Sequence, residues 1–283
     1  MKVILSRKGF DSSAGGCANP IMPDGTLVPL PIPDKASPIH YEDVRIGGHA
    51  LGPMVANLTR GKQKPHYGAH LDPDLDADSY PRGVGWRPLF GQGDAAQSVL
   101  EREGVRPGDL FLFFGWFRRV EEYGGTVRFA RGAPDLHVLW GWLQVDCILK
   151  FPADLAPSWA QYHPHATHAT SAAYCTKNTV YVATRGLRIG SDSLPLPGGG
   201  VFRRYDPRLQ LTKSGRNRSV WCLPTWFAPS PGRRALGYHD DFARWSVVGD
   251  RVELQTVARG QEFVLDAIEY PESLHWVLGL LGV

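Results

Sequence analysis

Three segments decide the fold: residues 110–117 (LFLFFGWF), 126–130 (TVRFA) and 137–149 (HVLWGWLQVDCIL). Aromatic and branched apolar side chains are frequent in all three, and such side chains favour pleated strands that are at least half buried. Pro107-Gly108 precedes the first segment and Gly124-Gly125 separates it from the second, as expected for turns that flank paired strands. The three segments therefore predict neighbouring strands of an antiparallel sheet.

Two helices and several shorter strands are predicted around this group. One helix is expected to begin at Asp94, with Asp94 as its N-cap, Gln97 at the capping-box position and Gly104 closing its end. Pro271 is expected to initiate a second helix, whose apolar stripe includes Val277. Further strands are predicted at residues 3–6, 179–183, 220–223, 243–248, 252–257 and 262–266.

These elements predict an α+β fold built mainly from antiparallel sheet, with a few helices packed on it. The chain has no internal repeat and no linker-like segment, so residues 1–283 are expected to form a single domain. Residues 108–150 are predicted to form a small PUA-like barrel with an aromatic pocket for a splayed base. Core packing is the simpler explanation for the aromatic side chains of this region, namely Phe111, Phe113, Trp140 and Trp142.

The composition excludes several classes of protein. A formal net charge of +3 is too small for a general DNA coat, so any basic surface must be local. The four cysteines form no C-x-x-C pair, which argues against a zinc ribbon or a thioredoxin-type site and fits reduced thiols in the cytosol. The apolar run Val3-Ile4-Leu5 is too short for a signal peptide, and no apolar stretch approaches the length of a bilayer span. We therefore expect a cytoplasmic protein without a membrane partner.

A polar, glycine-containing loop at residues 6–16 (SRKGFDSSAGG) directly follows the first predicted strand. Its glycines allow close backbone approach and its basic side chains supply charge, so the loop is suited to hold an anion. The alternative is a turn in which the aspartate and the serine bond their own backbone. On the functional interpretation Arg7, Gly15 and Gly16 bind phosphate, while Lys8, Asp11 and Ser12 belong to the catalytic site.

Four residues form a candidate site for a divalent metal ion: His70, Asp72, His163 and His165. The His70-x-Asp72 spacing occurs in iron sites that use two histidines and one carboxylate. His163-x-His165 on an extended backbone would direct both rings to the same side and make a ready chelate. The alternative is a solvated loop with ordinary hydrogen-bonded histidines.

Basic residues are concentrated between residues 203 and 218, close to two tryptophans. Phosphate contact together with base stacking would use such a segment, and a solvated basic loop is the alternative. The candidate phosphate-binding residues here are Arg204, Lys213, Arg216 and Arg218. Glu262 lies at the start of a late predicted strand, where it is either an acid/base group of the catalytic site or a satisfied strand residue.

Several strings along the chain together resemble the nucleotide-modification-associated domain family of the third type. They are SRKGFDSSAGG, HLDPDL, GDLFLFFGWFR, HVLWGWLQV, YHPH, NTVYVA and RGQEFVLD, and the resemblance runs from about residue 3 to residue 276. It implies an α+β domain connected with the modification of nucleotides or DNA. No reaction and no catalytic residue is implied by it.

The leading functional hypothesis is an enzyme that modifies a nucleotide or a DNA base and acts on a phosphate-bearing nucleotide or nucleic-acid substrate. A reader without catalytic activity, which binds modified bases in nucleic acid, is the alternative. A third hypothesis is a His/Asp metal-dependent iron oxygenase of bases. The expected partners are therefore nucleotides or nucleic acid; the sequence does not fix a cofactor, and a divalent metal ion is the candidate.

Overall fold

The computed structural model describes residues 1–171, 174–190, 192–258 and 260–283. Its main sheet runs in the order β18-β1-β8-β10-β11-β7, with β14 added to β10 and with β2 and β9 added to β8. The strands are β1 (Lys2–Arg7), β2 (Asn19–Ile21), β7 (Leu89–Gln92), β8 (Leu110–Tyr123), β9 (Thr126–Phe129), β10 (Leu136–Lys150), β11 (Thr179–Ala183), β14 (Gly199–Val201) and β18 (Glu262–Asp266).

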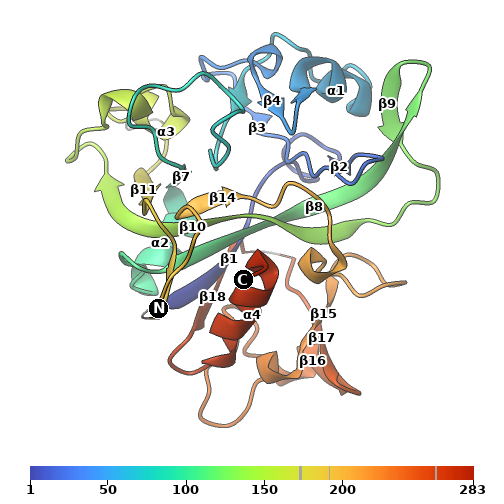
Figure 1. The fold of residues 1–283 in the computed structure, drawn as a ribbon, viewed down its shortest axis with the longest axis vertical. Coiled ribbons are helices and arrows are strands. Elements are labelled where there is room, and N and C mark those ends of the chain that lie inside the picture. Colours follow the sequence, from blue (N-terminus) through green and yellow to red (C-terminus); the bar gives the residue numbers. More distant parts are fainter. Residues whose placement is uncertain (172–173, 191, 259) are drawn as a thin grey trace.

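The remaining elements lie above and below the two long strands β8 and β10, which cross the middle of the molecule (Figure 1). The helices are α1 (Leu51–Leu58), α2 (Asp94–Arg102), α3 (Pro164–Thr167) and α4 (Glu272–Leu281). A separate sheet contains β15 (Val220–Pro224), β17 (Arg251–Gln255) and β16 (Trp245–Val248). Short pairs are β3 (Ile32–Pro33) with β6 (Ala69–His70), β4 (Arg45–Ile46) with β5 (His49–Ala50), and β12 (Arg188–Ile189) with β13 (Asp192–Ser193).

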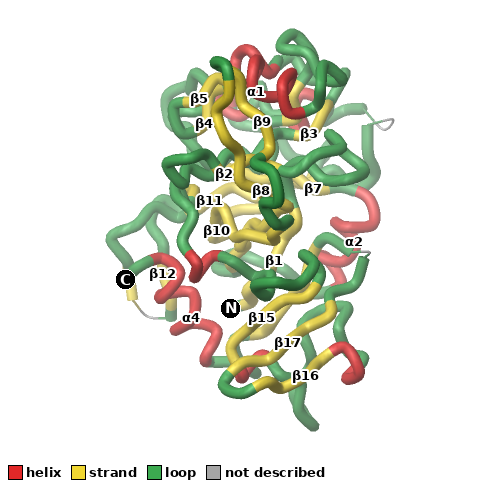
Figure 2. Tube along the Cα trace, turned by 90° about the vertical axis from the view of Figure 1, so that its right-hand side faces the viewer, coloured by secondary structure: helices red, strands yellow, loops and turns green. Residues whose placement is uncertain are grey.

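Most strand pairs are antiparallel, and β1 and β2 are the strands that run parallel to β8. The predicted α+β class with mainly antiparallel sheet is therefore confirmed. Figure 2 shows the three-stranded sheet at the opposite end of the molecule from α1. Within the described residues, no helix is both long and apolar enough to cross a bilayer.

The predicted PUA-like barrel at residues 108–150 is wrong, because the described strands close no barrel. Strand β10 pairs with β8 from Leu136 to Gln144 and then turns to β11, with a register shift between Val145 and Cys147. The two halves of β10 thus serve different neighbours, and the hairpin extends the sheet instead of closing on itself.

The aromatic side chains of β8 and β10 form the core, as the simpler explanation predicted. Phe111 and Phe113 are fully buried, and Trp140 and Trp142 are nearly so. Phe90 of β7 packs edge-to-face against both phenylalanines, with ring centroids 5.1 Å apart in each pair. This packing ties the edge strand β7 to the centre of the sheet.

Both predicted helices are present, but the expected cap of the first is wrong. The N-cap of α2 is Gly93, and the Asp94 carboxylate accepts hydrogen bonds from the backbone N–H and the hydroxyl of Thr176. Gln97 is buried and accepts a hydrogen bond from the Tyr181 hydroxyl instead of completing a capping box. A long-range contact to the segment before β11 therefore replaces the local cap.

The buried pair His137 and Trp221 allows a test of the fold by pH. The Trp221 indole N–H donates to Nδ1 of His137 over 2.9 Å, and burial, aided by nearby Arg218 and Arg7, lowers the pKa of His137 to about 3. The unfolded chain takes up this proton near the ordinary value of 6.5. The free energy of unfolding should therefore fall as the pH drops from 6.5 toward 3.

His137→Gln, which keeps an acceptor but cannot be protonated, should reduce that fall. Between pH 6.5 and about pH 5 we expect the loss of unfolding free energy in urea titrations to be about 2 kcal/mol smaller than in the parent. The same substitution at exposed His66 is the control and should leave the pH dependence unchanged. Equal slopes for parent and His137→Gln would contradict the buried neutral histidine.

Candidate functional site

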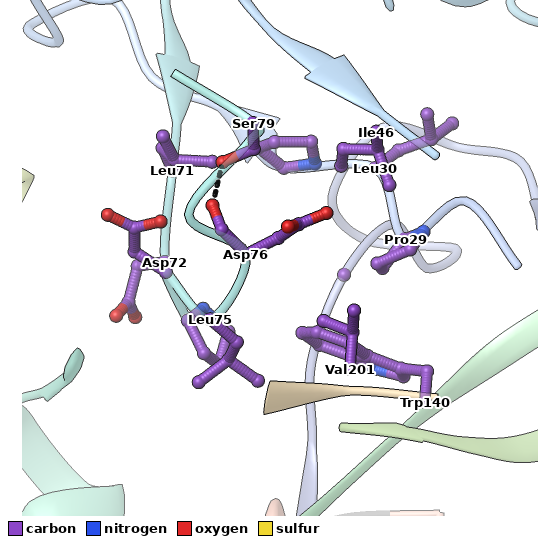
Figure 3. A pocket seen from close by; sticks show the side chains of 14 residues that line it. Pro29, Leu30, Ile46, Leu71, Asp72, Leu75, Asp76, Ser79, Trp140 and Val201 are labelled. Carbon is purple, nitrogen blue, oxygen red and sulfur yellow. Dashed lines mark hydrogen bonds between the residues drawn. The ribbon is translucent and has the colours of Figure 1, made fainter. Parts of the chain in front are cut away.

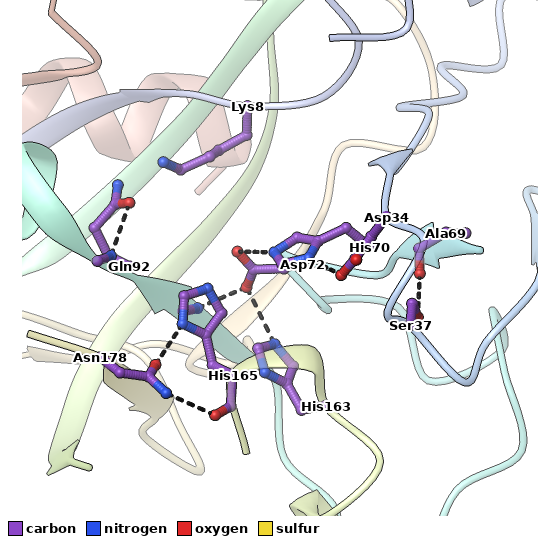
Figure 4. A network of polar contacts seen from close by, with 12 residues as sticks. Lys8, Asp34, Ser37, Ala69, His70, Asp72, Gln92, His163, His165 and Asn178 are labelled. Atoms are coloured by element: carbon purple, nitrogen blue, oxygen red, sulfur yellow. Dashed lines mark hydrogen bonds and ion pairs between the residues drawn. The ribbon is translucent and has the colours of Figure 1, made fainter. Parts of the chain in front are cut away.

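Asp72 lies at the centre of a histidine–carboxylate cluster beside the edge strand β7 (Figure 4). Its Oδ1 accepts a hydrogen bond from the backbone N–H of Gly91 over 2.6 Å and lies 3.1 Å from Nε2 of His163. Its Oδ2 lies 3.9 Å from Nε2 of His70. One carboxylate oxygen is thus held by the protein, while the other faces His70.

His70, the last residue of β6, is oriented by Asp34. The Nδ1 atom of His70 lies 3.0 Å from Oδ2 of Asp34, and this hydrogen bond lowers the pKa of the Asp34 carboxyl. A carboxylate accepts a hydrogen bond from a proton-bearing nitrogen, so Nδ1 carries a hydrogen. In the neutral ring the lone pair is then on Nε2. The free nitrogen is therefore the one that faces Asp72.

His165, in the first turn of α3, is oriented in the same way by Asn178. Asn178 donates from Nδ2 to the backbone carbonyl of His165 over 2.9 Å, which leaves its Oδ1 to accept from Nδ1 of His165 over 2.7 Å. The His165 ring packs on Gly91, where a Cβ atom would lie 2.1 Å from the imidazole carbon Cδ2. Burial lowers the pKa of His165 to about 4, which favours the neutral ring.

His70, Asp72 and His165 together could hold a metal ion. One ligand atom from each lies within 4.8 Å of the others. Burial alone would raise the pKa of Asp72, but the His163 hydrogen bond and the neighbouring imidazoles outweigh it and bring the pKa to about 2. Two imidazoles and one carboxylate make a donor set for a borderline divalent ion, and hydrogen bonds behind each histidine are typical of metal sites.

The extended backbone expected at His163 and His165 is wrong. His163 is the N-cap of the short helix α3 and His165 is inside it, so their rings do not alternate on an extended backbone. His163 bonds Asp72 through Nε2, and its Nδ1 is buried without a hydrogen-bond partner among the described residues. His163 thus orients the carboxylate, while His165 joins the possible ligands.

Lys8 and Glu262, both predicted for the catalytic site, contact each other next to this cluster. Oε1 of Glu262 accepts from the Lys8 ammonium over 3.0 Å, from the Ser6 hydroxyl over 3.1 Å and from the Gln92 amide over 2.6 Å. Gln92 follows Gly91 in β7, so adjacent residues of one strand contact Glu262 and Asp72. Oε2 of Glu262 is buried and has no hydrogen-bond partner among the described residues.

The rest of the predicted N-terminal loop forms a turn. Oδ1 of Asp11 accepts from the backbone N–H of Ser13 and Ala14 and from the Ser13 hydroxyl, as in the alternative interpretation of this loop. Ser12 is exposed, and Arg7 is the half-buried last residue of β1. None of these contacts involves the histidine–carboxylate cluster.

Gly15 and Gly16, predicted to bind phosphate, line a surface hollow. Both have positive φ, and a Cβ at Gly15 would lie 2.3 Å from the Phe10 ring, so this turn requires glycine. The hollow also contains Trp116, whose ring lies 4.2 Å from the Arg218 guanidinium carbon.

The other basic candidates do not gather at the cluster. Arg204 lies 4.0 Å from a carboxylate oxygen of Asp24, and Lys213 forms an ion pair with Glu253. Arg216 is exposed. Carboxylates therefore already neutralise part of the predicted basic patch.

Behind Asp72, a cavity of about 30 Å³ separates the segment 71–76 from Pro29, Trp140 and Val201 (Figure 3). This is room for an ordered water molecule and far too little for a nucleotide. The cavity is therefore part of the packing behind the segment that carries Asp72 and is not a nucleotide pocket.

The orienting residues Asp34, Asn178 and Gly91 were not predicted. Asp34 lies in a proline-rich stretch and Asn178 in a polar loop. Neither has a sequence spacing from a histidine that is typical of a known motif. Gly91 belongs to a GQG string that could be noticed but not assigned a role. Their functions arise from long-range contacts.

The fold and the cluster define an α+β protein with a buried histidine–carboxylate site at a sheet edge. The chain belongs to the family described as nucleotide modification associated domain 3, whose model matches residues 2–266. Neither the curated proteins nor the solved structures contain a match to it. The family confirms the resemblance seen in the sequence and indicates an association with nucleotide modification.

The hydrogen bond to Asn178 predicts the tautomer of His165. At about pH 7, long-range ¹H–¹⁵N spectra should show His165 with the proton on Nδ1. Asn178→Ala removes the acceptor and should shift the ring toward a mixture of tautomers, whereas Asn57→Ala on the exposed side of α1 should not. A dominant Nε2–H form in the parent would contradict the proposed orientation.

Proposed function

We propose that this protein is a divalent-metal-dependent enzyme that modifies a nucleotide or a nucleic-acid base. The observation that carries the proposal is the convergence of His70, Asp72 and His165, each held by a further residue. The family name supports a nucleotide-related substrate, and the geometry of the cluster supports metal chemistry. A metal bound by three protein ligands keeps open positions for water or substrate.

The protein groups around this site suit an enzyme. Asp34 and Asn178 fix the free nitrogens of the two imidazoles, and Gly91 and His163 fix the carboxylate. Preorganised ligands of this kind bind a metal without rearranging buried side chains.

Lys8 and Glu262 are the candidates for binding and proton transfer. The Lys8 side chain is 10% exposed and that of Glu262 is fully buried. Lys8 is thus placed to meet negative charge on a substrate. The unpartnered Oε2 of Glu262 is an acceptor for a substrate N–H or O–H group.

An iron oxygenase of bases is the second candidate. The donor set of two histidines and one carboxylate, with His70-x-Asp72 spacing and no thiolate, favours it. This chemistry needs O₂ and a two-electron reductant from outside the protein. The reader hypothesis has less support, because the aromatic side chains expected to form its pocket lie in the core.

Metal content tests the proposal directly. The parent protein, loaded with Fe²⁺, Mn²⁺ or Zn²⁺ under anaerobic conditions and dialysed, should retain about one ion per chain by inductively coupled plasma mass spectrometry. His70→Ala and His165→Ala should each abolish this. His163→Ala should retain the site with affinity about 10–100-fold lower, because His163 acts through Asp72.

His66→Ala is the matched control, because His66 is exposed and lies outside the cluster. It should bind metal like the parent. Circular dichroism of every variant separates loss of the site from loss of the fold. Failure of all three metals to bind the folded parent, or equal affinity in the parent and the His165→Ala variant, would remove the proposal.

A further inference from the structure

We infer that the substrate is a nucleic-acid strand rather than a free nucleotide, and that its phosphodiester backbone lies on a basic track. This inference rests on the function proposed above and names the substrate class of that site. The track is defined by four cations: Arg60, Lys62, Arg118 and Arg218.

The first part of the track is the hollow that contains Gly15 and Gly16. Its volume is about 310 Å³, and its wall combines the N-terminal loop, the end of α1 and strands β8 and β9. Three cations and no carboxylate line it, namely Arg60, Lys62 and Arg118. Arg218 extends the same surface by lying over the ring of Trp116.

These four cations differ from the basic residues of the surface that have a carboxylate partner. Among the described residues, none of the four forms an ion pair with a carboxylate, whereas Arg87, Arg208 and Arg234 do. Unpaired cations in one concave surface raise the local positive potential and attract phosphate. Arg118 also has a buried Nε atom without a hydrogen-bond partner among those residues.

Lys62 also lines a second hollow, whose wall includes the residue that orients His70. The second hollow has a volume of about 580 Å³ and is lined by Lys62, Tyr67 and Asp34, among others. Asp34 is the residue that holds Nδ1 of His70. The two hollows thus share Lys62, and the second is bounded by the carboxylate that holds a proposed metal ligand.

A polymer fits this arrangement better than a single nucleotide. A volume of about 580 Å³ already suffices for one nucleotide-sized ligand, so the cations beyond Lys62 are available for further phosphates. Trp116 in the first hollow and Tyr67 in the second offer rings for stacking of unpaired bases. Regularly repeated phosphates and bases are what a single strand supplies.

The salt dependence of oligonucleotide binding tests the track without any need for activity. A fluorescein-labelled single strand of about 20 nucleotides would be titrated by anisotropy at several salt concentrations, with its duplex as a second arm. Each phosphate contact contributes about 0.7 to the slope of log K against log salt for single strands. The R60Q/K62Q/R118Q variant should lower that slope by about 2, and K62Q alone by about 0.7.

The R87Q/R208Q/R234Q variant is the matched control, because it removes the same charge from cations that already have carboxylate partners. Its slope should equal that of the parent. Equal slopes in the track variant and this control would overturn the inference. Displacement of the strand by a nucleoside monophosphate at a similar concentration would do so too, since one phosphate would then suffice.

The two proposals can fail separately. Binding is measured without added metal, so a parent that binds no ion but shows the expected slopes retains the track and loses the metal site. A parent that binds metal while the track variant keeps the full slope retains the metal site and loses the track.

Discussion

The candidate site depends on one residue of the edge strand, Gly91. Its backbone N–H holds Oδ1 of Asp72, and its missing side chain leaves the space that the His165 ring fills. Pairing of Gly91 with Val180 of β11 fixes this backbone in the sheet, and the Phe90 side chain anchors it in the core. The positions of two possible ligands, Asp72 on a loop and His165 on the short helix α3, thus follow from a rigid strand. A loop supported in this way can be as precise as a secondary-structure element.

The cluster concentrates polar groups where burial is costly. Asp72, His163 and His165 are nearly inaccessible, and the charge on Asp72 is maintained by the imidazoles around it. A bound cation would compensate this carboxylate more fully than hydrogen bonds do. Buried polar groups that lower the stability of a protein without an ion, and are compensated when an ion binds, are common at functional sites. At such sites local stability is given up for activity.

Much of the fold could be predicted because apolar patterning is local information. The long strands around Phe111 and Trp140 and the terminal helix followed from their own residues. The barrel could not be judged, because the change of partner along β10 depends on β11. In the site, residue types identified His70, Asp72 and His165, but the roles of Asp34 and Asn178 depend on contacts between distant segments. The strand expected at His163 is wrong, because His163 is the N-cap of the short helix α3.

The segment that holds Asp72 also covers the open edge of the main sheet. Asp74 pairs with Leu89 through both backbone hydrogen bonds, and the next outward N–H of β7, that of Gly91, is bonded to the Asp72 side chain. An uncovered strand edge is a template for pairing with another chain. The same few residues therefore cover this edge and hold Asp72, which restricts how freely the segment can vary or move.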